Sequence, residues 1–166
     1  MDTRASDRAL GIPARGFAIA ISAALATTLA WGAAIAADDA FPLTVVDDEG
    51  TEVTIEAEPQ RIVSLSPSNT ETVFALGAGD RLVGGTDYDD YPAQAADLTD
   101  VATYTGVIME QVVALEPDLV LAAGNFFTPP DDIAAMRELG YPVVVTYAPD
   151  VDSVLADIEL IGASIG

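Results

Sequence analysis

The fold of this chain is decided by residues 61–71, which read RIVSLSPSNTE. The apolar residues at the start of this stretch are typical of a short interior strand, and Pro67 is expected to end that strand. Ser68 and Glu71 have the spacing of a capping box, in which each side chain accepts a hydrogen bond from the other residue's backbone N–H. The stretch therefore predicts a buried strand that runs directly into a helix, and Gly77 is expected to end the helix in the left-handed conformation.

Beyond this stretch, apolar runs and turn residues alternate along the chain. Further strands are expected near residues 81–85, 101–103, 118–122 and 142–146. Helices are expected near residues 69–76, 108–115, 131–139 and from 151 onward, with Pro117 and Gly140 closing the second and the third. The last two strands are apolar almost throughout, which is typical of parallel strands with helices on both faces. The predicted fold class is α/β, a three-layer lobe with a mostly parallel sheet flanked by helices.

A β-hairpin is predicted ahead of this lobe. Residues Leu43–Val46 and Glu52–Ile55 have strand-like sequences, and the acidic residues and glycine of Asp47–Gly50 favour a turn between them. The predicted organisation is therefore a linker and hairpin over residues 37–58, followed by the lobe over residues 59–166.

The beginning of the chain has the features of an export signal. Three arginines precede an apolar, alanine-rich run, and Ala34-Ile35-Ala36 fits the small-residue pattern that signal peptidase cleaves. Residues 1–36 are therefore predicted to be a cleaved signal peptide. The alternative is an uncleaved anchor, because the run approaches the ~20 residues that span a bilayer. The chain has no cysteine to carry a lipid, so an exported protein, periplasmic or extracellular and not lipid-anchored, is expected.

The chain is strongly acidic, with 27 acidic residues against six arginines and a formal net charge of −21. Loss of residues 1–36 removes two acidic residues and three arginines, which changes the formal charge to −22. Such a surface repels nucleic acid and anionic membranes as partners. The acidity fits adaptation to high salt, where the repulsion between carboxylates is screened, and it fits an ordinary acidic secreted protein equally well.

The composition excludes most common catalytic chemistry. The chain has no histidine and no cysteine, so it cannot form a Ser-His-Asp triad, a cysteine nucleophile or most zinc sites. Asp87, Asp89 and Asp90 fit a solvated turn, with paired catalytic carboxylates or a hard-cation site as alternatives. Gly77-x-Gly79 lacks the third glycine of a nucleotide-binding fingerprint and follows a helix, so it is interpreted as a helix-ending turn. No enzyme, no metal site and no cofactor are predicted.

Four segments resemble, in their order and spacing, the substrate-binding proteins of ABC importers for cobalamin, haem and iron–siderophore complexes. They are residues 61–71, 76–84 (LGAGDRLVG), 87–92 (DYDDYP) and 110–120 (EQVVALEPDLV). The resemblance covers residues 59–166, and it implies the amino-terminal lobe of a two-lobed protein.

The last residues, 151–166, fit the beginning of a helix with an apolar stripe formed by Val154, Leu155, Ile158 and Ile161. In the resembling proteins this helix connects the two lobes, so the lobe is expected to be truncated here, without the second half of the cleft. One lobe alone cannot enclose the roughly 70–90% of a ligand's surface that a closed pocket buries. Weak or no ligand capture by this chain alone is therefore expected.

The loops after the strands are expected to form the ligand-binding face, because ligands of open parallel sheets lie beyond the carboxyl ends of the strands. Aromatic rings in these loops suit a large flat ligand such as a corrin or a porphyrin, although a tyrosine can also simply pack its own loop. The resemblance singles out Tyr88, whose loop lines the cleft in cobalamin-binding relatives. The predicted ligand-binding residues are Ser66, Ser68, Tyr88, Tyr91, Tyr104, Asn125, Phe126 and Tyr147.

These loops contain no arginine, lysine or histidine, although catecholate and carboxylate siderophores normally require positive charge. A neutral ligand is therefore favoured, with cobalamin ahead of a hydroxamate siderophore. Haem is less favoured without histidine, although a tyrosine can serve as its axial ligand. A second lobe with its own arginines would change this preference.

The resemblance also implies that Glu71 docks onto arginines of a membrane permease, whereas the capping box needs no partner and is what the residues alone favour. The predicted function is the substrate-binding component of an ABC importer, which captures a cobalamin-like or iron-chelate ligand and delivers it to the permease. The alternative is a one-lobed permease-docking or regulatory module that carries no ligand. A carboxylate-based hydrolase is the third hypothesis.

Overall fold

The structure is a computed structural model that describes residues 40–124 and 128–166. Of the chain's two units, Met1–Ala36 and Ala37–Gly166, the described residues all belong to the second. The predicted signal peptide and the predicted ligand-binding residues Asn125 and Phe126 lie outside the described residues. In the described part of the chain, no helix is both long and apolar enough to cross a membrane.

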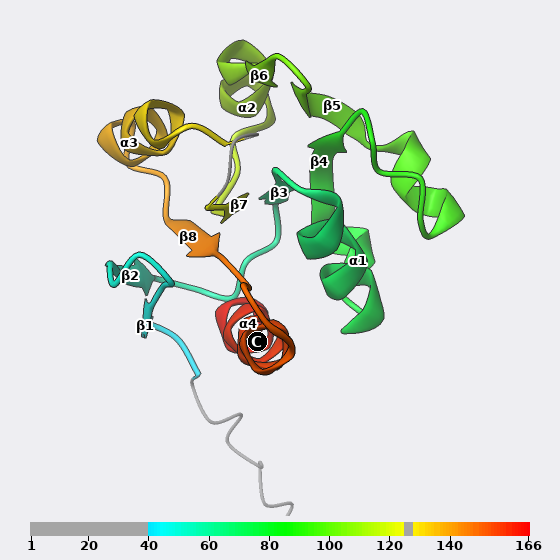
Figure 1. Ribbon diagram of the computed structural model, residues 1–166. Helices are drawn as coiled ribbons and strands as arrows, with labels where there is room; N and C mark the ends of the chain where they lie inside the picture. The colour runs from blue at the N-terminus through cyan, green and yellow to red at the C-terminus, as the bar shows by residue number, and fades with distance from the viewer. Residues whose placement is uncertain (1–39, 125–127) are drawn as a thin grey trace, which may run out of the picture. The chain divides into compact units, whose positions relative to one another are not determined.

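Within the described residues, six strands form one sheet in the order β6-β5-β4-β3-β7-β8. All neighbouring strands are parallel except β5 and β6. The chain runs from the central β3 outward to β5 and then returns to the other side of β3 with β7, so the winding direction reverses between β3 and β7 (Figure 1). The strands are β3 (Ile62–Ser64), β4 (Leu82–Thr86), β5 (Thr99–Thr103), β6 (Gly106–Val107), β7 (Leu119–Ala123) and β8 (Val143–Thr146).

Helices cover both faces of the sheet, as predicted for a three-layer lobe. The α-helices are α1 (Pro67–Ala75), α2 (Met109–Leu115), α3 (Pro130–Glu138) and α4 (Val151–Ile165). Two short 3₁₀ helices, η1 (Gly79–Arg81) and η2 (Ala93–Asp97), lie in the connections on either side of β4.

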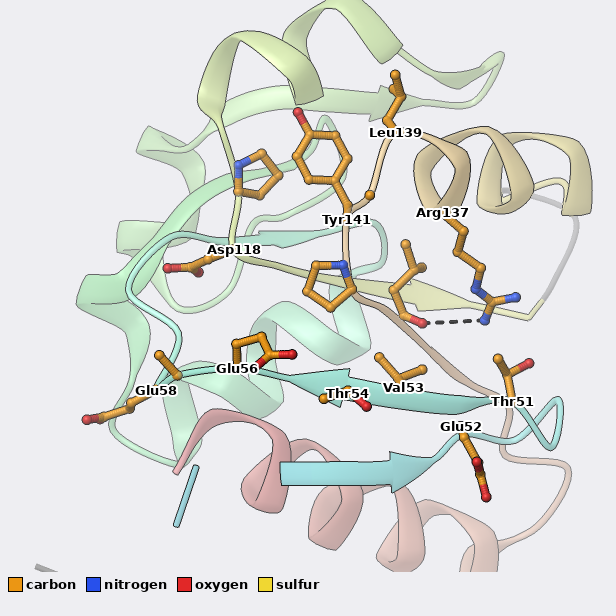
Figure 2. Close-up of a pocket in the computed structure, with 15 residues that line it drawn as sticks. Thr51, Glu52, Val53, Thr54, Glu56, Glu58, Asp118, Arg137, Leu139 and Tyr141 are labelled. Atoms are coloured by element: carbon orange, nitrogen blue, oxygen red, sulfur yellow. Dashed lines mark hydrogen bonds between the residues drawn. The ribbon is translucent and has the colours of Figure 1, made fainter. Parts of the chain in front are cut away.

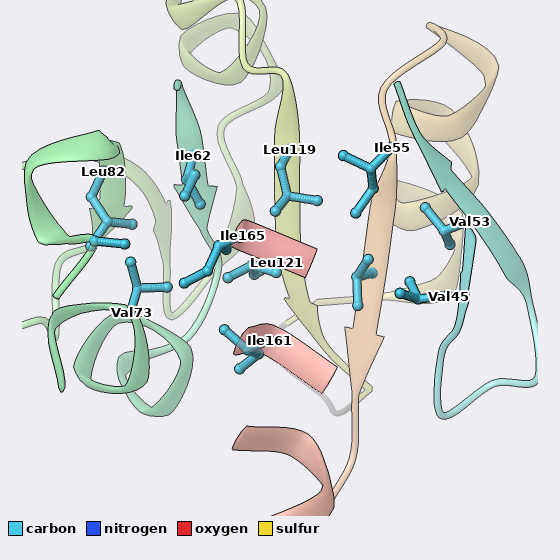
Figure 3. Close-up of a cluster of buried hydrophobic side chains, with 12 residues drawn as sticks. Val45, Val53, Ile55, Ile62, Val73, Leu82, Leu119, Leu121, Ile161 and Ile165 are labelled. Carbon is cyan, nitrogen blue, oxygen red and sulfur yellow. The ribbon is translucent and has the colours of Figure 1, made fainter. Parts of the chain in front are cut away.

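Successive residues of the strands enter two separate cores, because side chains alternate across a strand. On one face, Leu119 and Leu121 of β7 pack with Val73 of α1 and with Ile161 and Ile165 of α4 (Figure 3). On the other face, the alternate strand residues pack with α2 and α3, in a cluster that includes Val63, Val112, Val120, Ile133, Met136 and Val143. Each fully buried aliphatic side chain contributes about 1.5–3 kcal/mol to stability, so the two clusters fix the layers.

The predicted hairpin is confirmed, with β1 (Leu43–Val46) and β2 (Glu52–Ile55) paired antiparallel. Its apolar residues Val45, Val53 and Ile55 are buried in the same core as α1 and α4, beside β8 (Figure 3). The hairpin is therefore part of the lobe's core.

The start of α1 differs from the prediction. The N-cap is Ser66, whose hydroxyl accepts a hydrogen bond from the Asn69 N–H at 3.4 Å, and Pro67 is the first helical residue. Proline is favoured at this position because it lacks an N–H that would have no partner there. The capping box of Ser68 and Glu71 was therefore wrong, since Glu71 lies beyond the first turn.

The ends of the helices follow the prediction. Gly77 has a φ of +85°, and the N–H groups of Gly77 and Ala78 donate to the carbonyls of Phe74 and Val73, each at 3.0 Å. Helix α3 ends at Gly140 in the same way, with a φ of +90°. These are left-handed caps, which glycine adopts at little cost.

Helix α4 begins after Asp150, whose carboxylate accepts hydrogen bonds from the backbone N–H of Ser153 at 2.9 Å and from its hydroxyl at 2.7 Å. These hydrogen bonds hold the pKa of Asp150 below its ordinary value. Of the predicted apolar stripe, only Ile161 is buried, whereas Val154, Leu155 and Ile158 are exposed. The stripe is therefore divided between the core and an open helix face.

Candidate ligand-binding edge

The predicted site residues after β3, β4 and β5 gather around one hollow. This hollow, the Tyr88 pocket, has a volume of about 370 Å³ and is lined by Leu65, Ser66, Pro67, Ser68, Thr86, Tyr88, Ala102, Thr103 and Tyr104. Ser66 and Ser68 are joined by a hydrogen bond of 3.2 Å between their hydroxyls. The pocket therefore offers two aromatic rings and several hydroxyls beside the point where the sheet reverses its winding.

The rings of this pocket are not packed into the core. Tyr88 is 53% exposed and Tyr104 is 63% exposed. Large aromatic side chains that remain open to solvent at a concave site are typical of ligand-binding surfaces. This arrangement disfavours the alternative that these tyrosines only pack their own loops.

Tyr147 lines a second hollow at the ends of β7 and β8. This hollow, the Tyr147 pocket, has a volume of about 380 Å³ and is lined by Asp48, Glu49, Gly124, Thr128, Pro130, Ile133 and Tyr147. Tyr91 is 67% exposed and lines neither pocket. The structure thus brings together Ser66, Ser68, Tyr88 and Tyr104, places Tyr147 in a separate hollow, and leaves Tyr91 outside both.

Sequence reasoning missed several residues of the Tyr147 pocket. Asp48 reaches it because the hairpin turn is attached to β8, with the Asp48 N–H donating to the Val145 carbonyl at 3.1 Å. In addition, the Tyr147 N–H donates to the Asp48 carboxylate. No pattern in the neighbouring sequence predicts these contacts, because the residues that they join lie about a hundred positions apart in the chain.

The turn that carries Tyr88 is organised by a buried carboxylate. Asp87 and Asp90 are exposed as expected, but Asp89 is only 5% exposed. It accepts hydrogen bonds from the Thr86 N–H and hydroxyl, each at 2.9 Å, and from the Thr70 hydroxyl of α1 at 2.8 Å. The prediction of a solvated Asp89 was therefore wrong, because three hydroxyl and backbone donors replace its water shell.

Gly85 makes this arrangement possible. A Cβ atom at this position would overlap the Asp89 carboxylate oxygen, so a larger residue would displace the carboxylate from its donors. With Asp89 bound in this way, the turn is attached to α1, and Asp89 lines neither the Tyr88 pocket nor the Tyr147 pocket. Across residues 40–124 and 128–166, no group of three or more acidic residues is placed to hold a metal ion.

A further hollow, larger than these two, lies at the opposite edge of the sheet from the predicted site. This hairpin pocket, of about 680 Å³, lies between β2 and the starts of β7 and β8 (Figure 2). Its walls include Glu52, Asp118, Arg137 and Tyr141. None of the predicted ligand-binding residues lines it. Ligands of open parallel sheets bind at the carboxyl ends of the strands, so this pocket is not part of the candidate edge.

A carboxyl pair links the hairpin turn to α4. Burial, together with the hydrogen bond and the repulsion between its carboxyl group and that of Asp48, raises the pKa of Asp157 to about 6. Protonation of Asp157 therefore favours the folded state. The stability that it provides is fully present below the ordinary pKa near 3.8 and is lost as the pH rises through about 6.

We expect the Asp157→Asn variant to be more stable than the parent chain at pH 7 and almost equal to it at pH 4. The gain should stay below about 1 kcal/mol, because Asp157 is only half-buried and solvent partly screens its charge. Urea unfolding at both pH values measures the difference, with Glu159→Gln on the same helix as the control. An equal gain at both pH values would show that the carboxyl pair is not its cause.

The sheet reverses its winding between β3 and β7, and the Tyr88 pocket lies at the carboxyl ends of β3, β4 and β5. This arrangement defines the class of protein, an α/β lobe whose candidate site lies at the carboxyl ends of its strands. The family model described as periplasmic binding protein matches residues 62–166. The chain therefore belongs to this family of substrate-binding transport proteins, which indicates an exported protein.

Relatives with known sequences carry names from the same family. The chain is 40% identical over 130 residues to a Bacillus subtilis protein named an uncharacterized ABC transporter substrate-binding lipoprotein, covering 77% of this chain and 41% of that protein. It is 39% identical over 102 residues to the vitamin B12-binding protein of Vibrio cholerae, covering 60% of this chain and 36% of that protein. The chain thus spans about two fifths of the length of these relatives or slightly less.

Solved structures show the same fold. The periplasmic vitamin B12 binding protein BtuF of Vibrio cholerae superposes with a TM-score of 0.60 at 33% identity, over 64% of this chain and 42% of that one. The heme binding protein HmuT superposes with a TM-score of 0.64 at 28% identity, over 75% of this chain and 41% of that one. The mostly parallel sheet flanked by helices is therefore the fold of this family.

Proposed function

We propose that this chain forms the amino-terminal lobe of the substrate-binding component of an ABC importer. It captures a cobalamin-like or iron-chelate ligand at the Tyr88 pocket and delivers it to a membrane permease. The observation that carries this proposal is the pair of exposed rings, Tyr88 and Tyr104, over a hollow at the carboxyl ends of β3, β4 and β5. In this organisation, residues 1–36 are the signal peptide, 37–58 the linker and hairpin, and 59–166 the lobe.

The charge of the site favours a neutral ligand. Among the described residues that line the Tyr88 and Tyr147 pockets, none is an arginine, a lysine or a histidine. A carboxylate or catecholate ligand would therefore be desolvated here without a compensating cation. The names of the relatives include vitamin B12 and heme as ligands, and the neutral site supports a cobalamin-like ligand ahead of a siderophore or haem. Those names also favour ligand capture over the docking module without a ligand.

The protein is proposed to act outside the cytoplasm without a lipid anchor. The 166 residues contain no cysteine to which a lipid could be attached. The Bacillus subtilis relative is named a lipoprotein, so that relative does not support this part of the proposal.

Titration of the purified chain with cyanocobalamin tests the proposed function. We expect measurable binding with a Kd weaker than about 1 μM, because one lobe leaves much of the ligand exposed. Tyr88→Ala should weaken binding about tenfold, a loss of ~1.4 kcal/mol. Tyr91→Ala removes an equally exposed ring that lines neither pocket, so it serves as the matched control. Binding of haem but not of cyanocobalamin would change the ligand, and binding of neither would contradict the proposal.

Glu71 is proposed to dock onto basic residues of the permease. It is exposed on α1, its carboxylate makes no hydrogen bond or ion pair with the described residues, and Ser66 rather than Glu71 caps the helix. Helix capping, the structural role that competed with docking for Glu71, is therefore performed by Ser66. An exposed charge of this kind steers a protein toward a partner of opposite charge.

We expect Glu71→Arg to weaken binding to the permease in nanodiscs at least tenfold, and to reduce the dependence of binding on salt. Glu110→Arg is the matched control, because it makes the same charge change on α2, on the other face of the sheet. Equal losses for both variants would mean that net charge, and not a docking contact at Glu71, controls the association.

A further inference from the structure

The Tyr147 pocket contains a hydroxyl group without a partner. Thr128 is only 1% exposed, and its Oγ1 is the one buried side-chain oxygen or nitrogen among the described residues that makes no hydrogen bond. Buried polar groups in folded proteins are almost always hydrogen-bonded, so an exception requires an explanation. Thr128 lines a hollow of about 380 Å³ whose lining also includes the exposed Tyr147.

Carboxylates of the hairpin turn line the same hollow. Glu49 forms an ion pair at 3.2 Å with Arg137, a guanidinium group that it shares with Asp47. Asp48 accepts a hydrogen bond from the Tyr147 N–H and faces Asp157 of α4, and it has no cation beside it among the lining residues. The pocket is therefore rich in acceptors, and Pro130 and Ile133 supply an apolar wall.

The carboxylates and the Thr128 hydroxyl of this pocket favour some functional groups of a ligand over others. A carboxylate oxygen only accepts hydrogen bonds, whereas a threonine hydroxyl both donates and accepts. A primary amide matches both, because its NH₂ group donates to the carboxylates and its carbonyl accepts from the Thr128 hydroxyl. A carboxylate of the ligand would be repelled by Asp48, and an ammonium group would leave the donor of Thr128 without a partner.

We propose that the Tyr147 pocket is a subsite for a primary carboxamide group of the ligand. The amide would be bound by hydrogen bonds to the Asp48 carboxylate and the Thr128 hydroxyl. This inference rests on the proposed function, since the amide belongs to the same ligand whose flat face lies at the Tyr88 pocket. It assigns selectivity for amide-bearing ligands to the hairpin turn, a segment that precedes the main sheet. It also explains why the Thr128 hydroxyl makes no hydrogen bond in the free chain, since the ligand amide would be its partner.

The test compares cyanocobalamin with a corrinoid whose side-chain amides have been hydrolysed to carboxylates. Equilibrium dialysis against the full chain at millimolar ligand should show at least tenfold preference for cyanocobalamin. Thr128→Val, which replaces the hydroxyl by a methyl group of similar size, should weaken cyanocobalamin binding about fivefold and leave the hydrolysed corrinoid unchanged. Thr99→Val, which alters an exposed threonine outside all three pockets, is the matched control.

A second measurement is independent of the ligand. Thr128→Val should leave the thermal midpoint of the free chain unchanged or raised, because the lost hydroxyl has no partner in the free protein. If Thr128→Val binds cyanocobalamin like the parent chain while Tyr88→Ala does not, the amide subsite is overturned and the proposed function stands. If the parent chain binds neither corrinoid, the proposed function fails, and the subsite fails with it.

Discussion

Replacing Asp47 with asparagine is expected to lower the free energy of unfolding by about 3 kcal/mol, the lower end of the loss typical when one partner of a buried ion pair is removed. The Asp47 side chain is fully buried in the hairpin turn. One of its oxygens accepts hydrogen bonds from the N–H groups of Glu49 at 3.1 Å and Thr51 at 2.8 Å. The other accepts from Arg137 at 2.8 Å and from the Val145 N–H at 3.3 Å.

Asparagine cannot replace these contacts. Its amide carries one oxygen and one NH₂ group, so whichever way it is oriented, one pair of donors meets another donor. Arg137, which lies beside the hairpin in Figure 2, would also lose the negative charge that balances its guanidinium group. Because the same carboxylate joins the hairpin, α3 and β8, its loss should loosen the attachment of the hairpin to the sheet.

Urea unfolding followed by circular dichroism measures this loss. Glu49→Gln is the matched control, because Glu49 pairs with the same guanidinium group but is 38% exposed. An exposed ion pair contributes less than about 1 kcal/mol, so the control should differ little from the parent chain. Equal losses for the two variants would show that Asp47 acts only as a surface charge.

The second large effect is expected from Asp89→Asn, which should cost about 2 to 3 kcal/mol of stability. Asp89 is buried and satisfies donors from Thr86 and from Thr70 of α1. An amide in its place would leave at least one of these buried donors unpaired, and each such group costs about 1–3 kcal/mol. Tyr88 lies in the same turn, so its contribution to cyanocobalamin binding should fall as well.

Asp90→Asn separates this explanation from a general effect of charge. Asp90 is the exposed neighbour of Asp89, and a surface substitution of this kind usually changes stability by less than about 0.5 kcal/mol. Unfolding midpoints of the two variants, measured in urea under the same conditions, give the comparison. If Asp90→Asn were as unstable as Asp89→Asn, the hydrogen bonds of Asp89 would not be the cause.

Local patterns in the sequence were sufficient for the framework of the fold. The strands of the hairpin, the interior strands and the glycines at the ends of α1 and α3 were predictable because each depends on neighbouring residues. The cap of α1 was not, because Ser66 and Ser68 are both good caps and Pro67 fits either the end of a strand or the first position of a helix. Only the folded backbone distinguishes the two possibilities.

The candidate site was predictable where it follows strand ends, and not where it depends on remote contacts. Ser66, Tyr88 and Tyr104 each lie just after a strand, so the expected topology brings them together. Asp47, in contrast, meets an arginine 90 residues away, and Asp89 meets a hydroxyl 19 residues away. Acidic residues in turns are usually solvated, so nothing in these segments marked the two buried carboxylates in advance.

The division between the two cores and the loops beyond the strand ends has a consequence for how such proteins diversify. Residues such as Leu119, Val120 and Ile161 determine the layers, whereas the exposed rings of the two pockets, Tyr88, Tyr104 and Tyr147, belong to neither cluster. Mutations of these rings can therefore accumulate without disturbing the scaffold, as long as the buried carboxylates Asp47 and Asp89 are kept. Exchanging the segments that carry these rings between homologues is therefore a practical route to changing the ligand of the proposed site.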